Sequence, residues 1–177
     1  EKGFDGTSIR DISGAALHPG NYAYVGGNTK FYGAVLLRYR AEDFAPLRHL
    51  EGTTPGWPIA YDELEPFYQR AEGMYQVRGQ LGEDPSEPRH SGTYPHSPVP
   101  DEPAIADLRR RLTSVGLHPA SLPLGVDIER WLQGGNTGWD AYPNTTGGKM
   151  DAETIGIAQA SRHPNVTLRT NSPVTRL

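Results

Sequence analysis

The chain has 177 residues, of which 36% are apolar and 21% are charged, and its formal net charge is -4. The absence of cysteine excludes a disulfide framework, a thiolate metal site and a cysteine nucleophile. An acidic balance without a basic stripe argues against a nucleic-acid partner. No apolar run approaches the roughly 20 residues of a membrane helix, and the first residues lack the order of a signal peptide. We therefore expect a soluble chain without a membrane span, cytoplasmic rather than secreted.

Turn-forming residues are abundant, with 21 Gly and 16 Pro, and the mean hydropathy is -0.60. This composition predicts much irregular chain around a small apolar core. Residues 1–20 show no sustained period of 2 or 3.6, and the chain begins without Met. We expect an internal fragment of a longer protein.

A glycine pair, Gly26-Gly27, lies between two runs of β-branched and aromatic residues, Tyr22 to Val25 and Gly33 to Tyr39. The first run favours a strand, and the second fits a strand or a helix. Taken alone, the glycine pair is either a hairpin turn or a point at which a ligand approaches the backbone.

The residues after the glycine pair favour the ligand. Asn28, Thr29 and Lys30 place backbone N–H groups, a hydroxyl and a cation beside a stretch without side chains. This combination suits a phosphate or the edge of a flavin ring. The motif is neither a Gly-x-Gly-x-x-Gly fingerprint nor a P-loop, so it does not predict nucleotide binding without further support.

Two segments have the apolar spacing of a helix. In the first, Asp62 to Gln76, apolar residues recur at i, i+3, i+4, i+7 and i+11, with Asp62 as the N-cap and Gly79 as a stop. The second has Asp101 as its cap, Pro103 near its first turn and Gly116 at its C-terminal cap. Its expected apolar face consists of Ile105, Leu108, Leu112 and Val115.

The remaining segments are punctuated by Gly and Pro. Residues 83–103 contain six prolines and are predicted to form an extended connector. Asp151 is predicted to cap a last helix that runs to about Arg162. Two short strands are expected after it, Val166 to Arg169 and Val174 to Leu177.

Other candidate sites have simpler explanations. The six histidines lack the spacing of three or four that would set two on one helical face, so we expect no metal site. Two carboxylate pairs, Glu63 with Glu65 and Asp151 with Glu153, lie in predicted first turns, where acidic residues commonly face the helix dipole. The tryptophans either line a sugar-sized or aromatic pocket or serve as packing anchors. They are Trp57, Trp131 and Trp139.

Four blocks of sequence follow one another in a recognisable order. They are Tyr24 to Ala34 with Leu37 to Arg40 and Asp43-Phe44; Gly56 to Ile59 with Tyr61, Leu64, Pro66, Tyr68 and Ala71-Glu72; Gly82 to Pro85 with Glu87-Pro88 and Tyr94-Pro95; and Lys149, Asp151-Ala152, His163 to Leu168 and Val174 to Leu177. Together they resemble the glucose-methanol-choline family of flavoprotein oxidoreductases, particularly its bacterial members. The resemblance spans nearly the whole chain.

The resemblance implies an enzyme that uses FAD to remove hydride from the CH–OH group of a small-molecule alcohol or sugar. The electron acceptor is oxygen or another molecule. In the family, the glycine turn runs beside the flavin and the pyrophosphate, and a later strand meets the adenine through its backbone. The cofactor-binding residues implied here are Gly26, Gly27, Asn28, Thr29, Tyr32, Gly33 and Val174.

The chain also departs from the family pattern. The N-terminal Gly-x-Gly-x-x-Gly unit and the C-terminal region with the catalytic His are absent, so we expect the catalytic residues to lie outside this chain. Phe31 stands near the position where some relatives attach FAD through a His, and a Phe cannot form that bond. Relatives often carry cysteines where this chain has residues 139–144. The alternative function is a non-catalytic carbohydrate- or partner-binding module, or an inactive fragment.

The expected fold is mixed α/β, of the α+β kind, and rich in loops. It corresponds to an incomplete part of an FAD-binding Rossmann-like domain with the start of a substrate domain. Residues 1–82 form the predicted flavin-contacting segment, residues 83–103 the proline-rich connector, and residues 104–177 a helix, a loop and the return to the FAD-binding domain.

Overall fold

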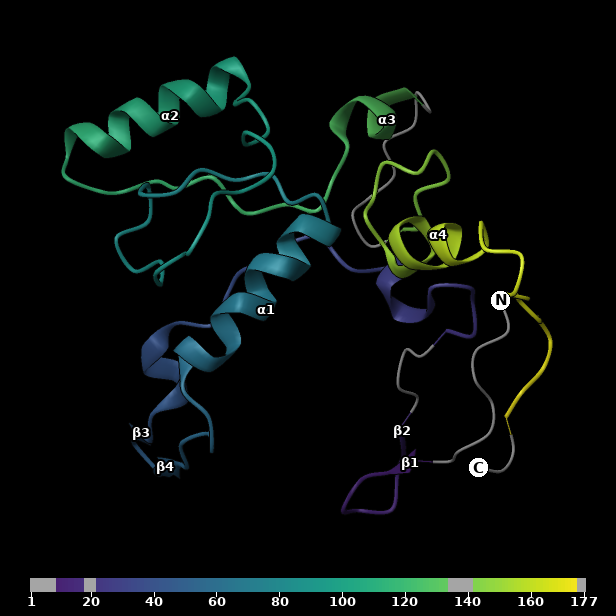
Figure 1. Cartoon of the computed structure of the whole chain (residues 1–177). Coiled ribbons are helices and arrows are strands. Elements are labelled where there is room, and N and C mark those ends of the chain that lie inside the picture. Colours follow the sequence, from purple (N-terminus) through teal and green to yellow (C-terminus); the bar gives the residue numbers. More distant parts are fainter. Residues whose placement is uncertain (1–8, 18–21, 134–141, 175–177) are drawn as a thin grey trace. The chain divides into compact units, whose positions relative to one another are not determined.

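The computed structural model describes residues 9–17, 22–133 and 142–174 (Figure 1). The strands are β1 (Ile9–Arg10), β2 (Ala16–Leu17), β3 (Leu47–His49) and β4 (Gly52–Thr54). The α-helices are α1 (Tyr61–Met74), α2 (Pro103–Ser114), α3 (Ile128–Gln133) and α4 (Ala158–Ala160). Three shorter helical turns are η1 (Gly27–Lys30), η2 (Ala41–Phe44) and the π-helical η3 (Glu153–Ile157). The mixed, loop-rich class expected from the sequence is confirmed.

The chain forms two compact units. The first contains Glu1–Gly33 and Glu129–Leu177, and the second contains Ala34–Ile128. The proline-rich segment 83–103 therefore falls within the second unit, without regular secondary structure between residues 83 and 102. The three-part division expected from the sequence stays a prediction.

The strands of the described residues pair as two antiparallel hairpins. In one, Ile9 lies opposite Leu17 and Arg10 opposite Ala16, and in the other Leu47, Arg48 and His49 lie opposite Thr54, Thr53 and Gly52. The parallel sheet of a Rossmann-like domain is not formed by these strands.

Single β-bridges hold the centre of the second unit. Val35 pairs with Leu124, Leu124 with Arg78, and Arg78 with His96, so four extended segments lie in one row. Val77 beside this row is completely buried. The run Gly33 to Tyr39 forms neither the strand nor the helix expected from the sequence. Ala34 adopts φ 60°, and the run pairs only through the Val35–Leu124 bridge and the neighbouring Leu36 N–H, which donates to the Pro123 carbonyl at 2.9 Å.

Helix α1 matches the first predicted helix, with a different cap. Its N-cap is Ala60, whose N–H donates to Glu63 Oε1 at 2.9 Å, while Asp62 pairs with Arg89 at 3.0 Å. At the other end Gln76 adopts φ 50°, and the Val77 N–H donates to the Glu72 carbonyl at 3.0 Å. The helix ends in this Schellman-type turn before Gly79 is reached.

Helix α2 confirms the second predicted helix, with Pro103 as its first residue. The expected cap was wrong, because Asp101 binds the Arg109 guanidinium at 2.6 and 3.1 Å and Glu102 occupies the cap position. A paired, charge-assisted contact satisfies that carboxylate better than one backbone N–H. Gly116, at φ 82°, takes the predicted left-handed position after the helix.

The last predicted helix forms over η3 and α4, and Asp151 Oδ1 accepts the Thr154 N–H at 2.8 Å, as a cap does. The strand expected at Val166 to Arg169 was wrong, since this exposed stretch has no strand pairing. Of the strand expected at Val174 to Leu177, residues 175–177 lie outside the described residues. No helix in the described part of the chain has the length and apolarity to cross a bilayer.

Candidate functional site

The glycine turn is a tight left-handed bend that leads into η1. Gly26 and Gly27 have φ values of 91° and 56°, a region that only glycine enters without strain. The Gly27 N–H donates to the Tyr24 carbonyl at 2.9 Å. Because a 3-10 helix and not a paired strand follows, the interpretation as a simple hairpin turn was wrong.

The Thr29 and Lys30 side chains bond to other parts of the chain. Thr29 Oγ1 donates to the Gly26 carbonyl and accepts the Ala152 N–H at 3.0 Å. The buried Lys30 ammonium pairs with Asp151 at 3.0 Å and with Glu153. Burial lowers the pKa of Lys30, but these two carboxylates outweigh it and raise the pKa above its usual value. The hydroxyl and cation expected to meet a ligand are therefore engaged within the protein.

Asn28 and Tyr32 are held in the same way. Asn28 Oδ1 accepts the Tyr22 N–H at 3.0 Å, and the Tyr32 hydroxyl donates to the Met150 carbonyl at 2.7 Å. The Phe31 ring packs against Tyr22, with centroids 4.2 Å apart. The turn packs against segment 149–153, which the sequence had marked as a predicted helix cap, a carboxylate pair and part of a family block.

The two glycines of the turn differ in what surrounds them. A Cβ on Gly26 would lie 3.1 Å from the Glu153 nitrogen, so Gly26 is required by close internal packing. A Cβ on Gly27 would meet nothing within 4 Å. The main chain at Gly27 is therefore open toward the described surroundings, as it is at Gly14 and Gly82.

The other predicted cofactor residues are less tightly placed. Gly33 is exposed at the end of the turn. Val174 is 77% exposed in an extended stretch, and the described contacts do not join it to the turn by a hydrogen bond. The structure thus brings the residues from Gly26 to Tyr32 together over segment 149–153, and Val174 stands apart.

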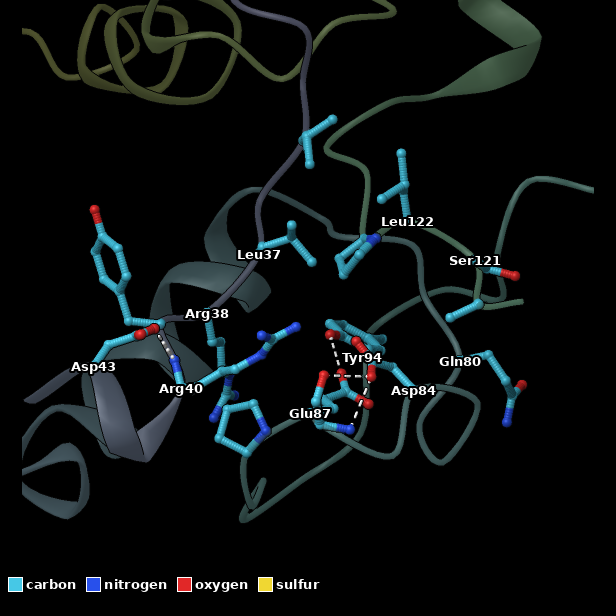
Figure 2. A pocket seen from close by; sticks show the side chains of 16 residues that line it. Leu37, Arg38, Arg40, Asp43, Gln80, Asp84, Glu87, Tyr94, Ser121 and Leu122 are labelled. Carbon is cyan, nitrogen blue, oxygen red and sulfur yellow. Dashed lines mark hydrogen bonds between the residues drawn. The ribbon is translucent and has the colours of Figure 1, made fainter. Parts of the chain in front are cut away.

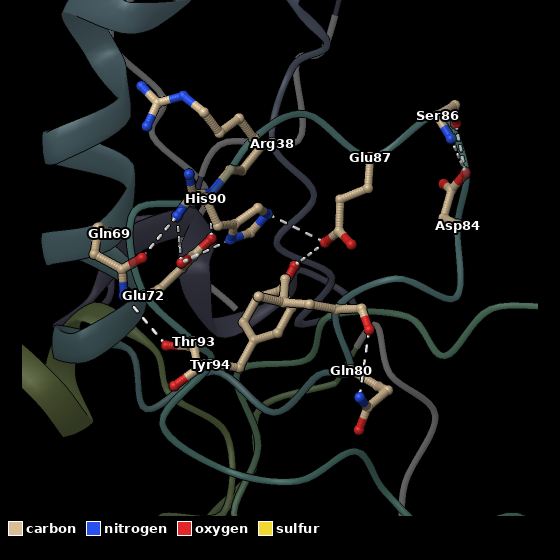
Figure 3. A network of polar contacts seen from close by, with 12 residues as sticks. Arg38, Gln69, Glu72, Gln80, Asp84, Ser86, Glu87, His90, Thr93 and Tyr94 are labelled. Carbon is tan, nitrogen blue, oxygen red and sulfur yellow. Dashed lines mark hydrogen bonds and ion pairs between the residues drawn. The ribbon is translucent and has the colours of Figure 1, made fainter.

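The second unit contains a buried polar network that the sequence analysis missed (Figure 3). Arg38 donates to both carboxylate oxygens of Glu72, at 2.6 and 2.7 Å, and to Glu65 at 3.1 Å. Burial opposes the charge on Arg38, but the hydrogen bonds to Glu72, Tyr61 and Glu65 raise its pKa. The Glu65 pKa is lowered, first by the Ser91 N–H and then by Arg38. Glu65 is therefore bound to Arg38 and to the Ser91 N–H, which favours a structural role over an acid–base pair with Glu63.

His90 lies beside this network with a side chain that is only 3% exposed. Its Nε2 is 3.2 Å from Glu87 Oε1, which also accepts the Tyr94 hydroxyl at 2.7 Å. Burial and the neighbouring Arg38 lower the pKa of His90, although Glu72 and Glu87 oppose them. Burial and the bond to Glu87 raise the pKa of Tyr94. The Tyr94 ring also explains Gly79, where a Cβ would lie 2.6 Å from that ring.

A half-open cavity of about 520 Å³ adjoins the network (Figure 2). Its polar lining includes Arg40, Gln80, Asp84, Glu87 and Ser121, and its apolar lining includes Leu37 and Leu122. Most of these polar groups are already bonded within the protein: Asp84 accepts from Ser86, and Ser121 from Arg109. The cavity does not by itself define a ligand.

Comparison with known proteins reveals relatives along most of the chain. Paromamine 6'-oxidase of Streptomyces fradiae is 32% identical over 168 residues, which cover 90% of this chain and 29% of that protein. The 6'''-hydroxyparomomycin C oxidase of Streptomyces lividus is 32% identical over 90% of this chain and 30% of its own length. The chain is a homologue of glucose-methanol-choline oxidoreductases.

A third glucose-methanol-choline relative matches a shorter stretch. The 2-methyl-1,2-propanediol dehydrogenase of Mycolicibacterium austroafricanum is 36% identical over 96 residues, or 53% of this chain and 17% of that protein. No protein-family model matches the chain. The chain spans less than a third of the length of these relatives. The family resemblance drawn from the sequence is confirmed.

The tryptophans within the described residues behave as packing anchors. Trp57, although half exposed, has its ring 6.0 Å from that of Phe44. The Trp131 ring lies 5.6 Å from the Lys149 ammonium. Trp139 lies outside the described residues. These contacts favour packing over a sugar-sized or aromatic pocket.

Proposed function

We propose that this chain is part of an FAD-dependent oxidoreductase that oxidises the CH–OH group of an alcohol or sugar. The observation that carries the proposal is the 32% identity to two oxidases over 90% of the chain. A third relative is named as a dehydrogenase of a diol, which supports the same reaction class. FAD would accept the hydride from the alcohol carbon and pass the electrons to an acceptor.

The chain's part in this reaction is to bind and orient the cofactor. We assign the cofactor contacts to Gly26, Gly27, Asn28, Thr29, Tyr32, Gly33 and, at the adenine, Val174. Open space in front of Gly27 supports contact through the backbone, since Thr29 and Lys30 turn their polar groups inward. We assign proton removal from the alcohol to residues outside this chain, because the candidate carboxylates Glu63 and Asp151 cap helices.

A chimera tests the proposal. The chain replaces the matching segment of the Streptomyces fradiae paromamine 6'-oxidase, and flavin content is measured by visible absorbance and by FAD released on denaturation. We expect the chimera to retain flavin. A chimera with native secondary structure but no flavin would contradict the proposal. Saturable sugar binding by that flavin-free protein, followed by tryptophan fluorescence, would instead favour the binding-module alternative.

A matched pair of variants locates the contact. In the chimera, Gly27→Val puts a β-branched side chain into the open space and should lower flavin content. Gly14→Val also puts a β-branched residue at positive φ, at 86° against 56° for Gly27 and with nothing within 4 Å, but lies in the β1–β2 hairpin. We expect Gly14→Val to keep the flavin, and equal losses from both variants would speak against contact at Gly27.

A further inference from the structure

Among the described residues of the first unit, Lys149 is the most deeply buried cation, and its ammonium binds main-chain oxygens. Its side chain is fully buried, and Nζ donates to the carbonyls of Tyr32 at 2.9 Å, Tyr142 at 3.1 Å and Lys30 at 3.2 Å. The ammonium also lies 5.8 Å from the centre of the Tyr32 ring. Burying an ammonium is costly unless its donors are bonded, so these three acceptors hold it firmly and are held by it.

Two of the acceptors belong to the end of the glycine turn. The carbonyls of Lys30 and Tyr32 flank Phe31, and the Tyr32 hydroxyl returns to the Met150 carbonyl next to Lys149. The turn and segment 149–150 are thus joined by hydrogen bonds in both directions, from Lys149 to the turn and from Tyr32 to Met150. A Gly-Gly sequence without such a constraint would sample many conformations.

The third acceptor connects a different loop to the same ammonium. Tyr142 precedes Asn144, whose Oδ1 accepts the Thr146 and Gly148 N–H groups at 3.1 and 2.8 Å. A single cation therefore ties the 142–148 loop to the turn. Loss of that cation should loosen both segments at once.

We propose that Lys149 is a positioning residue that fixes the glycine turn and the 142–148 loop in the conformation that accepts the cofactor. Fixing the turn before binding removes part of the ordering cost that binding would otherwise carry. The link to a cofactor rests on the proposed function, whereas the fixing of the two segments does not.

Hydrogen exchange of the 177-residue chain tests the fixing without any flavin. Lys149→Met keeps the length of the side chain and removes its three donors. We expect amide exchange in 26–33 and in 142–148 to rise about tenfold or more, as for the loss of a charged hydrogen bond, while α4 keeps its protection. Lys149→Arg should restore much of the protection, and Arg169→Met, at an exposed site, should change neither segment.

Tyr32→Phe provides a milder second variant. It removes only the hydroxyl that donates to the Met150 carbonyl, so exchange should rise in 26–33 and stay unchanged in 142–148. Unaltered exchange of both segments in Lys149→Met would overturn the proposal. So would a uniform rise that includes α4, because it would show general destabilisation.

The same variants in the chimera test the link to the cofactor. We expect the FAD dissociation constant to rise about tenfold in Lys149→Met and to recover in Lys149→Arg. A flavin-free parent chimera would refute the proposed function while leaving the exchange result standing. A Lys149→Met chimera with looser segments but unchanged FAD affinity would refute the positioning role alone.

Discussion

At the glycine turn, the polar side chains of Thr29 and Lys30 are bonded to other residues of the chain and not directed at a ligand. Thr29 binds the backbone of Ala152, and Lys30 binds Asp151 and Glu153. The residue types in the turn suggested a hydroxyl and a cation that face a ligand. A sequence gives the residue types but not the directions in which their side chains point. What remains open is the main chain at Gly27.

His90 provides a pH test at the same scale. Its pKa is lowered in the folded chain, first by burial and then by Arg38, against the opposing charges of Glu72, Glu87 and Glu65. The unfolded chain therefore takes up this proton at a higher pH than the folded chain. The stability that His90 contributes is complete above about pH 6.5, the ordinary value, and decreases as the pH falls below it.

The measurement compares the wild type with His90→Gln. Unfolding free energies are determined by urea between about pH 5 and pH 7.5, where one proton changes stability by up to about 1.4 kcal/mol per pH unit. We expect the wild type to lose stability more steeply than His90→Gln as the pH falls. Parallel pH profiles would show that His90 titrates alike in both states.

At the scale of elements, the glycine after α2 followed a local rule, whereas the N-terminal caps of α1 and α2 and the contacts between elements did not. Gly116 ends α2 as predicted, because its left-handed φ of 82° depends only on neighbouring residues. The contact of α1 with the segment 35–40 depends instead on Arg38, Glu65 and Glu72. Their sequence separation of 27 and 34 residues carries no local periodic signal.

That contact predicts a large cost for Arg38→Met. The variant leaves two carboxylates buried without their cation, which should lower the free energy of unfolding by about 3–5 kcal/mol. Arg89→Met removes an ion pair with Asp62 whose side chains are 62% and 77% exposed, and should cost far less, because solvent screens an exposed pair. The free energies of unfolding of the two variants are compared by urea denaturation followed by circular dichroism. Equal losses of stability would show that the buried network contributes no more than the exposed ion pair.

For the whole molecule, the sparse core predicted from composition is observed. Buried apolar residues are few among the described residues, namely Ala34, Phe44, Tyr61, Val77, Tyr94, Val126, Met150 and Ile155. The expected apolar face of α2 is not buried, since Ile105 and Leu108 are each 49% exposed and Val115 is 73% exposed. The helix forms as its pattern requires, while its apolar face lacks a covering layer within the described chain.

This exposed face predicts binding of a hydrophobic dye. We expect the chain to enhance the fluorescence of anilinonaphthalene sulfonate, as exposed apolar patches do. Leu108→Lys should reduce the enhancement and change the free energy of unfolding by less than about 0.5 kcal/mol, because a half-exposed site loses little packing. A large loss of stability in this variant would show that the face is packed in solution.

The sequence by itself determined the family, the loop-rich mixed class, α1, α2 and the cap at Asp151. These features depend on motif order or on contacts within a few residues, which periodicity and capping residues reveal directly. The tertiary structure alone decided that Lys149 holds the turn across 117 and 119 residues of sequence. It also decided that the Arg38 charge is paired with Glu65 and Glu72 of α1, and that no atom lies within 4 Å of a Cβ built on Gly27. Such features depend on which distant segments contact each other. The sequence alone does not distinguish a charged residue that is buried from one that is exposed.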